Sequence, residues 1–337
     1  MNDTATTPPR DAPIALVLGI TGAIGGAIAF RLAARGFRIR ALSRRPLDPA
    51  RFGFPVEVAI GDARDARAVS TAAAGASLIV HGVNPAGYRR WREEALPMLA
   101  STIEAAAAHR ATILFPGNVY VFDERAPARV DEATPRRPAT EKGRVRLEME
   151  TLLEEAARAR GVRTIALRAG DFFGPGVESS WLAQAILKGG REARAFTRLS
   201  PPGIGHAFAY VPDLAEAFAR LVDRRETLAP FTLLHFAGHY DTRGVAFAQA
   251  AARVLGRDLK TKRFSWALVR LAAPFSPFLR EVVEMAWLFR HPLALDNAAL
   301  ERLIGPEPHT PLDQALARTL GLADAAQPGT AAQPAFA

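Results

Sequence analysis

A glycine-rich turn follows the first apolar run of this sequence. The run Ile14–Leu18 has the length and composition of a buried strand, and Gly19, Gly22 and Gly25 come directly after it. The stretch Ala27–Ala34 that follows has helical character. A strand, a glycine turn and a helix in this order present backbone N–H groups and the positive end of a helix dipole to a pyrophosphate. The segment therefore predicts a dinucleotide site, whereas the glycine spacing alone would also fit a plain structural turn.

Apolar, strand-like runs then alternate with segments of helical length. The further strand-like runs are 37–42, 56–60, 78–83, 112–115 and 164–167, and the helical segments include 91–108 and 141–160. Such alternation is typical of a parallel sheet with helices on both faces. Together with the glycine turn it predicts an α/β fold, a doubly wound parallel sheet of the Rossmann type. Beyond residue 170 the spacing becomes irregular, which indicates a small C-terminal substrate lobe.

We expect four segments along the chain. They are a tail at 1–12, a dinucleotide-binding domain at 13–170, a segment at 171–325 that completes the sheet and forms the substrate lobe, and a tail at 326–337. Both tails have the polar or Pro/Ala/Gly-rich composition of disordered segments. The apolar region 264–289 is interrupted by charges and prolines, so it cannot cross a bilayer and belongs in the core or in a lid over the substrate.

Composition excludes several classes of function. The sequence has no cysteine, which excludes disulfides, thiolate catalysis and a Cys-based zinc site, and favours a cytoplasmic protein. The later histidines lack the spacing of metal ligands, so we expect no metal. The net charge of +9 would suit a nucleic-acid surface, but the arginines are scattered among glutamates. We expect neither a nucleic-acid nor a membrane partner.

Several spaced motifs resemble the extended short-chain dehydrogenase/reductases, also called the NAD-dependent epimerase/dehydratase family. The family's glycine turn corresponds to 18–25, with leucine in place of its first threonine, and its strand-end Gly-Asp pair to Gly61–Asp62. Its Leu-Arg-Pro-x-x-x-Tyr-Gly-Pro-Gly stretch is similar to 167–176. Its Tyr-Val-x-Asp-Leu-Ala helix start is similar to 210–215, where Asp213 is expected as the helix N-cap. The resemblance covers nearly the whole chain and implies an NAD(P)-dependent oxidoreductase.

The resemblance also implies the cofactor contacts. In the glycine turn they fall on Gly19, Thr21, Gly22, Ala23, Ile24 and Gly25. At the end of the second strand, where an acidic residue would bind the ribose of NAD, this chain has Ser43, Arg44 and Arg45. Two guanidiniums without a carboxylate favour the 2′-phosphate of NADP, with NAD as the alternative, although both could be plain exposed loop residues. Asp62 would lie beside the adenine, and His81 either lines the cofactor or is a satisfied strand-end histidine.

The sequence departs from the family at the catalytic centre. Relatives that transfer a hydride use a Tyr-x-x-x-Lys pair, and here the tyrosine falls on Lys142 and the lysine on Arg146. A shift of two residues would give Thr140 and Arg144, so the tyrosine is absent in either case. At the end of the fifth strand, Asn118 stands where the family has serine or threonine.

Two interpretations of this centre stay open. In the first, Lys142 is desolvated, crowded by Arg146, and replaces the tyrosine as proton donor, while Asn118 binds a carbonyl oxygen. Lysine-dependent relatives of the isoflavone-reductase type give an analogy. In the second, hydride chemistry is lost and the protein binds the dinucleotide as a sensor, as the negative-transcriptional-regulator-like relatives do. Lys142 could also be an exposed residue at a helix start.

Other polar residues could supply the acid or base. Asp171, where many relatives have asparagine, would lie near the nicotinamide and could bind substrate or act as a base. Tyr120 and Tyr88 could provide a phenol from other loops, and His206 belongs to the expected substrate lobe. We expect a small carbonyl or hydroxyl compound or a sugar derivative as substrate, and we consider a homodimer.

Overall fold

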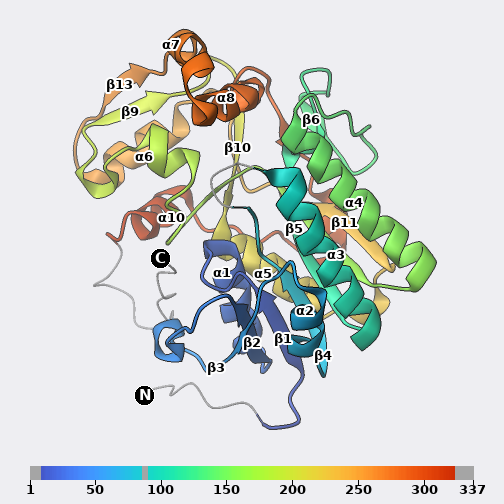
Figure 1. Cartoon of the computed structure of the whole chain (residues 1–337). Coiled ribbons are helices and arrows are strands. Elements are labelled where there is room, and N and C mark those ends of the chain that lie inside the picture. Colours follow the sequence, from blue (N-terminus) through green and yellow to red (C-terminus); the bar gives the residue numbers. More distant parts are fainter. Residues whose placement is uncertain (1–8, 86–89, 323–337) are drawn as a thin grey trace.

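The computed structural model describes residues 9–85 and 90–322, and it places seven parallel strands in one central sheet (Figure 1). The strand order is β11-β7-β5-β4-β1-β2-β3. The bounds are β1 Ile14–Leu18, β2 Arg38–Ser43, β3 Val56–Ile60, β4 Ala76–His81, β5 Thr112–Asn118, β7 Thr164–Ala169 and β11 Phe231–His235. The order reverses between β1 and β4, and ligands of such sheets bind outside the carboxyl ends at this point. The predicted doubly wound fold is confirmed.

Helices cover both faces of this sheet. One face carries α1 Ala23–Ala33, α5 Val211–Val222 and α9 Ala298–Ile304, and the other carries α2 Ala66–Ala72, α3 Trp91–His109 and α4 Glu141–Arg160. Alternate residues of β1 belong to the two cores: Ala15 and Val17 pack under α1 and α5, whereas Leu16 and Leu18 pack under α2, α3 and α4. A strand buried on both faces has no polar alternation, which explains its continuous apolar run.

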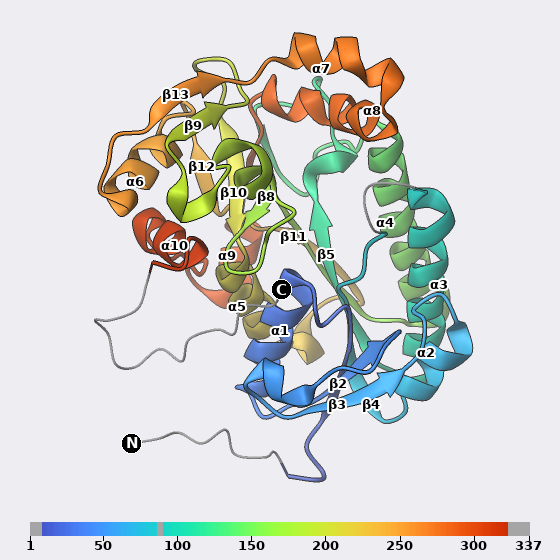
Figure 2. The same cartoon turned by 60° about the vertical axis from the view of Figure 1, so that its left-hand side comes forward.

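The second half of the chain adds smaller sheets around an aromatic core (Figure 2). The three-stranded sheet holds β8 Asp171–Phe173, β10 His206–Tyr210 and β12 His239–Asp241. Two further pairs are β9 Ala195–Arg198 with β13 Lys260–Arg263, and β6 Arg129–Val130 with β14 Ala294–Leu295. The helices of this half beyond α5 and α9 are α6 Ala246–Leu255, α7 Trp266–Ala272, α8 Pro277–Glu284 and α10 Leu312–Thr319.

The apolar region 264–289 divides into two parts. Helices α7 and α8 contain no buried residue, whereas the 3-10 helix η8, Met285–Phe289, is buried throughout. Within 9–85 and 90–322, no helix is both long enough and apolar enough to span a membrane. The expected tail at 326–337, and the first eight residues of the tail at 1–12, lie outside the described residues.

The interpretation of Asp213 as the N-cap of α5 is wrong. The N-cap is Tyr210, and Asp213 lies in the first turn of the helix. Its carboxylate accepts hydrogen bonds from the N–H and the Oγ1 of Thr310, at 2.6 and 2.7 Å. Asp213 therefore ties α5 to the segment before α10 instead of capping its own helix.

Candidate active site

The turn between β1 and α1 has the geometry of a pyrophosphate cradle. Gly19 has a φ of 86°, and the N–H of Gly22 donates to its carbonyl oxygen at 3.0 Å. A Cβ at Gly19 would lie 2.6 Å from the carbonyl oxygen of Gly82, and a Cβ at Gly25 would collide with the carbonyl oxygen of Gly19. The nearest protein atom to a Cβ at Gly22 would be 3.4 Å away. Packing thus requires glycine at 19 and 25, while glycine at exposed position 22 leaves the surface open to a ligand.

The positive end of α1 lies at this turn. No side chain caps the helix, and its first turn holds no acidic residue. The backbone N–H groups and the helix dipole therefore favour an anion, and the diphosphate of a dinucleotide fits these residues.

The ends of β2 and β3 form the adenosine side of the site. Arg44 and Arg45 are exposed, and the N–H of Arg45 donates to Ser43 Oγ at 3.3 Å. Arg64 donates to both carboxylate oxygens of Asp62, at 3.1 and 2.7 Å, and these bonds lower the pKa of Asp62 to about 2. The charge of Asp62 is thus balanced by Arg64, and Arg44 adds to the positive field.

Arg146 of α4 joins the ends of two strands. Its guanidinium lies 5.7 Å from the ring centroid of Phe115 on β5 and 5.2 Å from that of Trp91. Its Nη2 donates to Asn84 Oδ1, on the loop after β4, at 2.8 Å. Arg146 is thus held between β5 and the loop that follows β4.

His81, the last residue of β4, is buried and neutral. Its Nδ1 lies 2.8 Å from Thr102 Oγ1, and this hydroxyl donates to the carbonyl oxygen of Met98. The bonding pattern indicates that His81 donates from Nδ1 and leaves Nε2 unprotonated. Burial, reinforced by the charge of Arg146, lowers the pKa of His81 to about 3.

We expect His81 to make the protein less stable in acid. In the unfolded chain the imidazole of His81 takes up a proton near pH 6.5, whereas in the folded chain it does so only near pH 3. The contribution of His81 to the free energy of unfolding is therefore fully present above pH 6.5 and is lost as the pH falls from 6.5 to 3. Between pH 7.5 and 5, this residue should lower the free energy of unfolding by about 2 kcal/mol. Urea unfolding of the wild type and of His81→Gln at both pH values measures this effect. On going from pH 7.5 to 5, the free energy of unfolding of the variant should fall by about 2 kcal/mol less than that of the wild type. An equal fall in both proteins would show that His81 does not cause the loss of stability in acid.

Lys142 is the buried centre of a contact between α4 and α8. Its side chain is 2% exposed, and Nζ donates to Glu284 Oε2 at 2.6 Å and to Glu281 Oε2. The other oxygen of Glu284 accepts from the N–H groups of Glu141 and Lys142 at the start of α4. The exposed helix-start interpretation is therefore wrong: Lys142 is a desolvated group whose charge faces two carboxylates.

Asn118 lies beside the start of α4. Its Oδ1 accepts from the N–H of Tyr120 at 3.1 Å, which makes Asn118 the N-cap of the 3-10 helix η3, Val119–Val121. Gly143 approaches this helix so closely that a Cβ would collide with the carbonyl oxygen of Tyr120. Lys142 is thus fixed next to the end of β5. The ring of Tyr120 is buried in the aromatic core, and Tyr88 lies outside the described residues.

Asp171 bonds to a histidine of the lobe. Asn118 is the register partner of Ala169, so Asp171 follows β7 at the same edge of the sheet as Asn118. Its Oδ2 lies 2.7 Å from His206 Nε2, and His206 Nδ1 lies 3.2 Å from the carbonyl oxygen of Leu288. A carbonyl oxygen only accepts, so Nδ1 is the donor in that contact, and Nε2 faces the carboxylate of Asp171.

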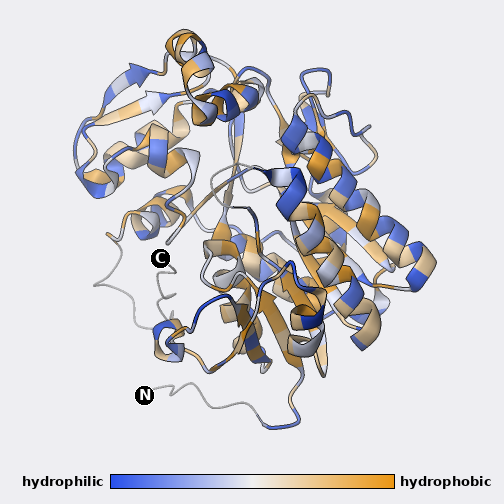
Figure 3. Ribbon diagram, in the orientation of Figure 1, coloured by the Kyte–Doolittle hydropathy of each residue, from blue (hydrophilic) through white to orange (hydrophobic). Residues whose placement is uncertain are grey.

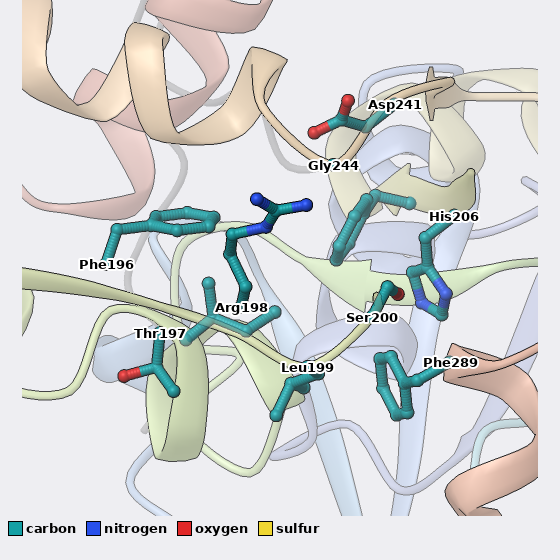
Figure 4. A pocket seen from close by; sticks show the side chains of 11 residues that line it. Phe196, Thr197, Arg198, Leu199, Ser200, His206, Asp241, Gly244 and Phe289 are labelled. Carbon is teal, nitrogen blue, oxygen red and sulfur yellow. The ribbon is translucent and has the colours of Figure 1, made fainter. Parts of the chain in front are cut away.

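A cleft opens beside His206 (Figure 4). Its lining residues are Ile186, Phe196, Thr197, Arg198, Leu199, Ser200, His206, Phe208, Asp241, Gly244 and Phe289. The ring of His206 stacks on Phe289 with centroids 4.6 Å apart. Figure 4 shows the guanidinium of Arg198 pointing toward Gly244 and Asp241. Its buried Nη2 has no hydrogen-bond partner among the residues that the structure describes.

Sequence reasoning missed two residues of this arrangement. Glu281 and Glu284 follow Lys142 by 139 and 142 positions, and no motif marks them. Their only signal is that they are charged positions within an apolar region. His206 was recognised only through its place before the motif at Tyr210.

The fold, the glycine cradle and the polar groups at the ends of β4, β5 and β7 define a dinucleotide-binding enzyme of the doubly wound α/β class. The sequence profile of the NAD dependent epimerase/dehydratase family matches residues 15–233. The chain belongs to this family, and it is an NAD(P)-dependent enzyme of the oxidoreductase and epimerase kind.

Known relatives agree with this membership. The chain is 29% identical over 252 residues to a 3-diazoavenalumate denitrifying reductase from Streptomyces sp., a match that covers 66% of this chain and 80% of the relative. A putative epimerase from Burkholderia cenocepacia J2315 shares the fold with a TM-score of 0.74 and 19% identity, over 94% of this chain and 98% of that one. The UDP-glucose 4-epimerase from Bifidobacterium longum, solved with NAD+ and UDP, has a TM-score of 0.74 and 15% identity, over 92% and 97%.

Proposed function

We propose that the protein is an NADP-dependent reductase of a small carbonyl compound, with Lys142 as the proton donor. The observation that supports this most is the burial of Lys142, which the resemblance aligns with the family's tyrosine, next to the end of β5. The similarity to a protein named as a reductase favours reduction over epimerisation.

The arrangement provides a route for the proton. When bound, the cofactor supplies the hydride that reduces the carbonyl carbon. Lys142 Nζ then donates a proton to the carbonyl oxygen as the alcohol forms. Glu281 is one-third exposed and bonds to Nζ, so it can return a proton from water to the buried amine. Lys142 thereby acts as a relay between solvent and substrate.

The remaining candidates have positioning roles in this proposal. Asn118 has an amide N–H₂ donor left for a substrate oxygen, because its Oδ1 is already bonded. Arg146 takes the place of the family's lysine toward the cofactor ribose. Asp171 orients His206 at the entrance of the cleft.

The cleft favours a particular substrate class. Phe196, Phe208 and Phe289 line it with aromatic rings, and Arg198 has a buried Nη2 without a partner. Aromatic walls with one unpaired guanidinium donor suit an aromatic or otherwise apolar molecule that carries a carboxylate or another anionic group. The reductase relative is named for 3-diazoavenalumate.

The preference for NADP rests on exposed Arg44 and the balanced charge of Asp62. Arg44→Ala should weaken NADPH binding by about 1.5 to 3 kcal/mol, the scale of a lost charge-assisted hydrogen bond, and leave NADH nearly unchanged. Calorimetry with both cofactors measures this, and Arg302→Ala, an exposed arginine on α9, is the matched control. Equal losses for both cofactors would overturn the preference.

The activity is tested by NADPH consumption with aldehydes, ketones, aromatic carbonyl acids and sugar nucleotides. If none of these compounds is reduced while NADPH still binds tightly, the sensor interpretation is favoured.

The homodimer and the cytoplasmic location remain predictions, which size-exclusion chromatography and cell fractionation would check.

A further inference from the structure

The segment α7–η7–α8 presents apolar side chains to solvent. Leu268 and Leu271 on α7 are 66% and 73% exposed, and Phe275 and Phe278 are 88% and 56% exposed. Leu268 and Leu271 are three residues apart on α7 and so lie on one side of that helix. Phe275 ends the 3-10 helix before α8, and Phe278 lies in the first turn of α8, with the extended Ser276 between them. Helices α7 and α8 and the 3-10 helix η7, Ala273–Phe275, contact one another. We call these four side chains the apolar patch.

The stretch of chain that carries this patch contains cations and no acid before Glu281. Between Asp258 and Glu281 the chain has no Asp or Glu. The cations of this stretch are all exposed: Lys260, Lys262, Arg263, Arg270 and Arg280. Three of them lie on β13, whose four residues are all exposed. Lysines on an edge strand discourage strand pairing, but that role does not account for the neighbouring leucines and phenylalanines.

The two acids of α8 are engaged within the molecule. Glu281 follows Phe278 by three residues on the same helix, but its carboxylate and that of Glu284 are both paired with Lys142. Figures 1 and 2 both show β13, α7 and α8 at the top of the molecule, on the opposite side from β2 and β3. Figure 3 shows the orange α7 beside the blue β13, which is an apolar element next to a polar one.

We propose that the apolar patch and its cations dock on an anionic lipid surface. Helices that bind at a membrane surface place Leu, Phe and Trp among the lipid headgroups and hold Lys and Arg against anionic lipids. This segment has the same combination of residues. A second copy fits poorly, because a two-fold interface would set the same cations against each other. Nucleic acid fits less well, since two of the four patch side chains are leucines, which do not stack on bases. This proposal departs from the expectation of no membrane partner. No segment needs to cross the bilayer, so a surface contact is compatible with the charged interruptions of 264–289.

The test is co-sedimentation of the full chain with vesicles. One set contains phosphatidylcholine with about one-third phosphatidylglycerol, and the other contains phosphatidylcholine alone. We expect binding to the anionic set, weakened when salt is raised from about 0.1 M to about 0.5 M. Phe275→Ser with Phe278→Ser should reduce partitioning at least about tenfold. Lys260→Gln with Lys262→Gln and Arg263→Gln should have an effect of similar size.

Matched controls lie outside the segment. Ile60→Ser removes another exposed apolar side chain, and Arg158→Gln with Arg302→Gln removes exposed cations. Neither variant should change the partitioning of the protein onto anionic vesicles.

Hydrogen exchange of the wild type gives a second readout. Anionic vesicles should protect backbone amides only in residues 260–280. Absence of binding, or equal binding by the patch variants, overturns the proposal. Self-association that the phenylalanine variants abolish, without vesicle binding, would make a second copy the occupant instead.

Discussion

Gly25→Ala is expected to abolish NADP binding and to lower the free energy of unfolding by about 1 to 3 kcal/mol. The added Cβ would collide with the carbonyl oxygen of Gly19, which belongs to the backbone and cannot rotate away. Relief of this clash must move either the start of α1 or the turn. Both movements misplace the N–H groups that face the pyrophosphate. Calorimetric titration and urea unfolding of the purified variant measure the two effects.

Gly22→Val separates ligand contact from packing. A Cβ at Gly22 would have its nearest neighbour at 3.4 Å, and the residue is exposed, so the circular dichroism and unfolding of this variant should stay near those of the wild type. Binding should nevertheless be lost, because the branched side chain occupies the surface that the pyrophosphate approaches. Retention of wild-type affinity in Gly22→Val would place the dinucleotide elsewhere.

Lys142→Met is expected to reduce turnover by at least about a hundredfold while NADPH still binds, the usual effect of losing a general acid. It should also destabilise the fold by roughly 1 to 3 kcal/mol. Breaking a fully buried ion pair costs more, but Glu281 and Glu284 are one-third and one-fifth exposed, so water screens part of the loss. Steady-state kinetics on a substrate found in the screen and urea unfolding provide the readouts.

A triple variant distinguishes chemistry from stability. Lys142→Met combined with Glu281→Gln and Glu284→Gln removes the unpaired carboxylates, so stability should recover while turnover remains lost. Recovery of both would assign Lys142 a structural role. Full turnover in Lys142→Met, together with loss in Tyr120→Phe or Asp171→Asn, would show that the acid comes from another loop.

Much of the central sheet could be predicted from the sequence. The strands at 14–18 and 56–60 and the helix at 141–160 have the expected bounds, because their ends coincide with charges, glycines or prolines. The fourth strand was expected at 78–83 but ends at His81, where its pairing with Leu18 ends. The apolar pattern continues past that point, since Val83 still packs against the core. Hydrophobicity marks burial, whereas strand bounds depend on a partner that the local sequence does not reveal.

The candidate site could be predicted only in part. Alignment of motifs places Lys142, Arg146 and Asn118 near one another because they follow fixed elements of the sheet. It gives no sign of Asn84 as the partner of Arg146, nor of the carboxylates that α8 brings to Lys142. Asn84 lies on an irregular loop after β4, and α8 belongs to the lobe, whose short elements have no periodicity that predicts their packing.

The double engagement of Glu284 has an evolutionary consequence. One oxygen of this residue binds Lys142 Nζ, and the other binds the backbone at the start of α4. Lys142→Tyr would place a phenol at this position and leave two glutamates without their cation beside it. An exchange of the lysine for a tyrosine therefore passes through an unfavourable intermediate, unless Glu281 and Glu284 have changed first. The side chain tolerated at position 142 is thus determined by a helix that is far away in the sequence.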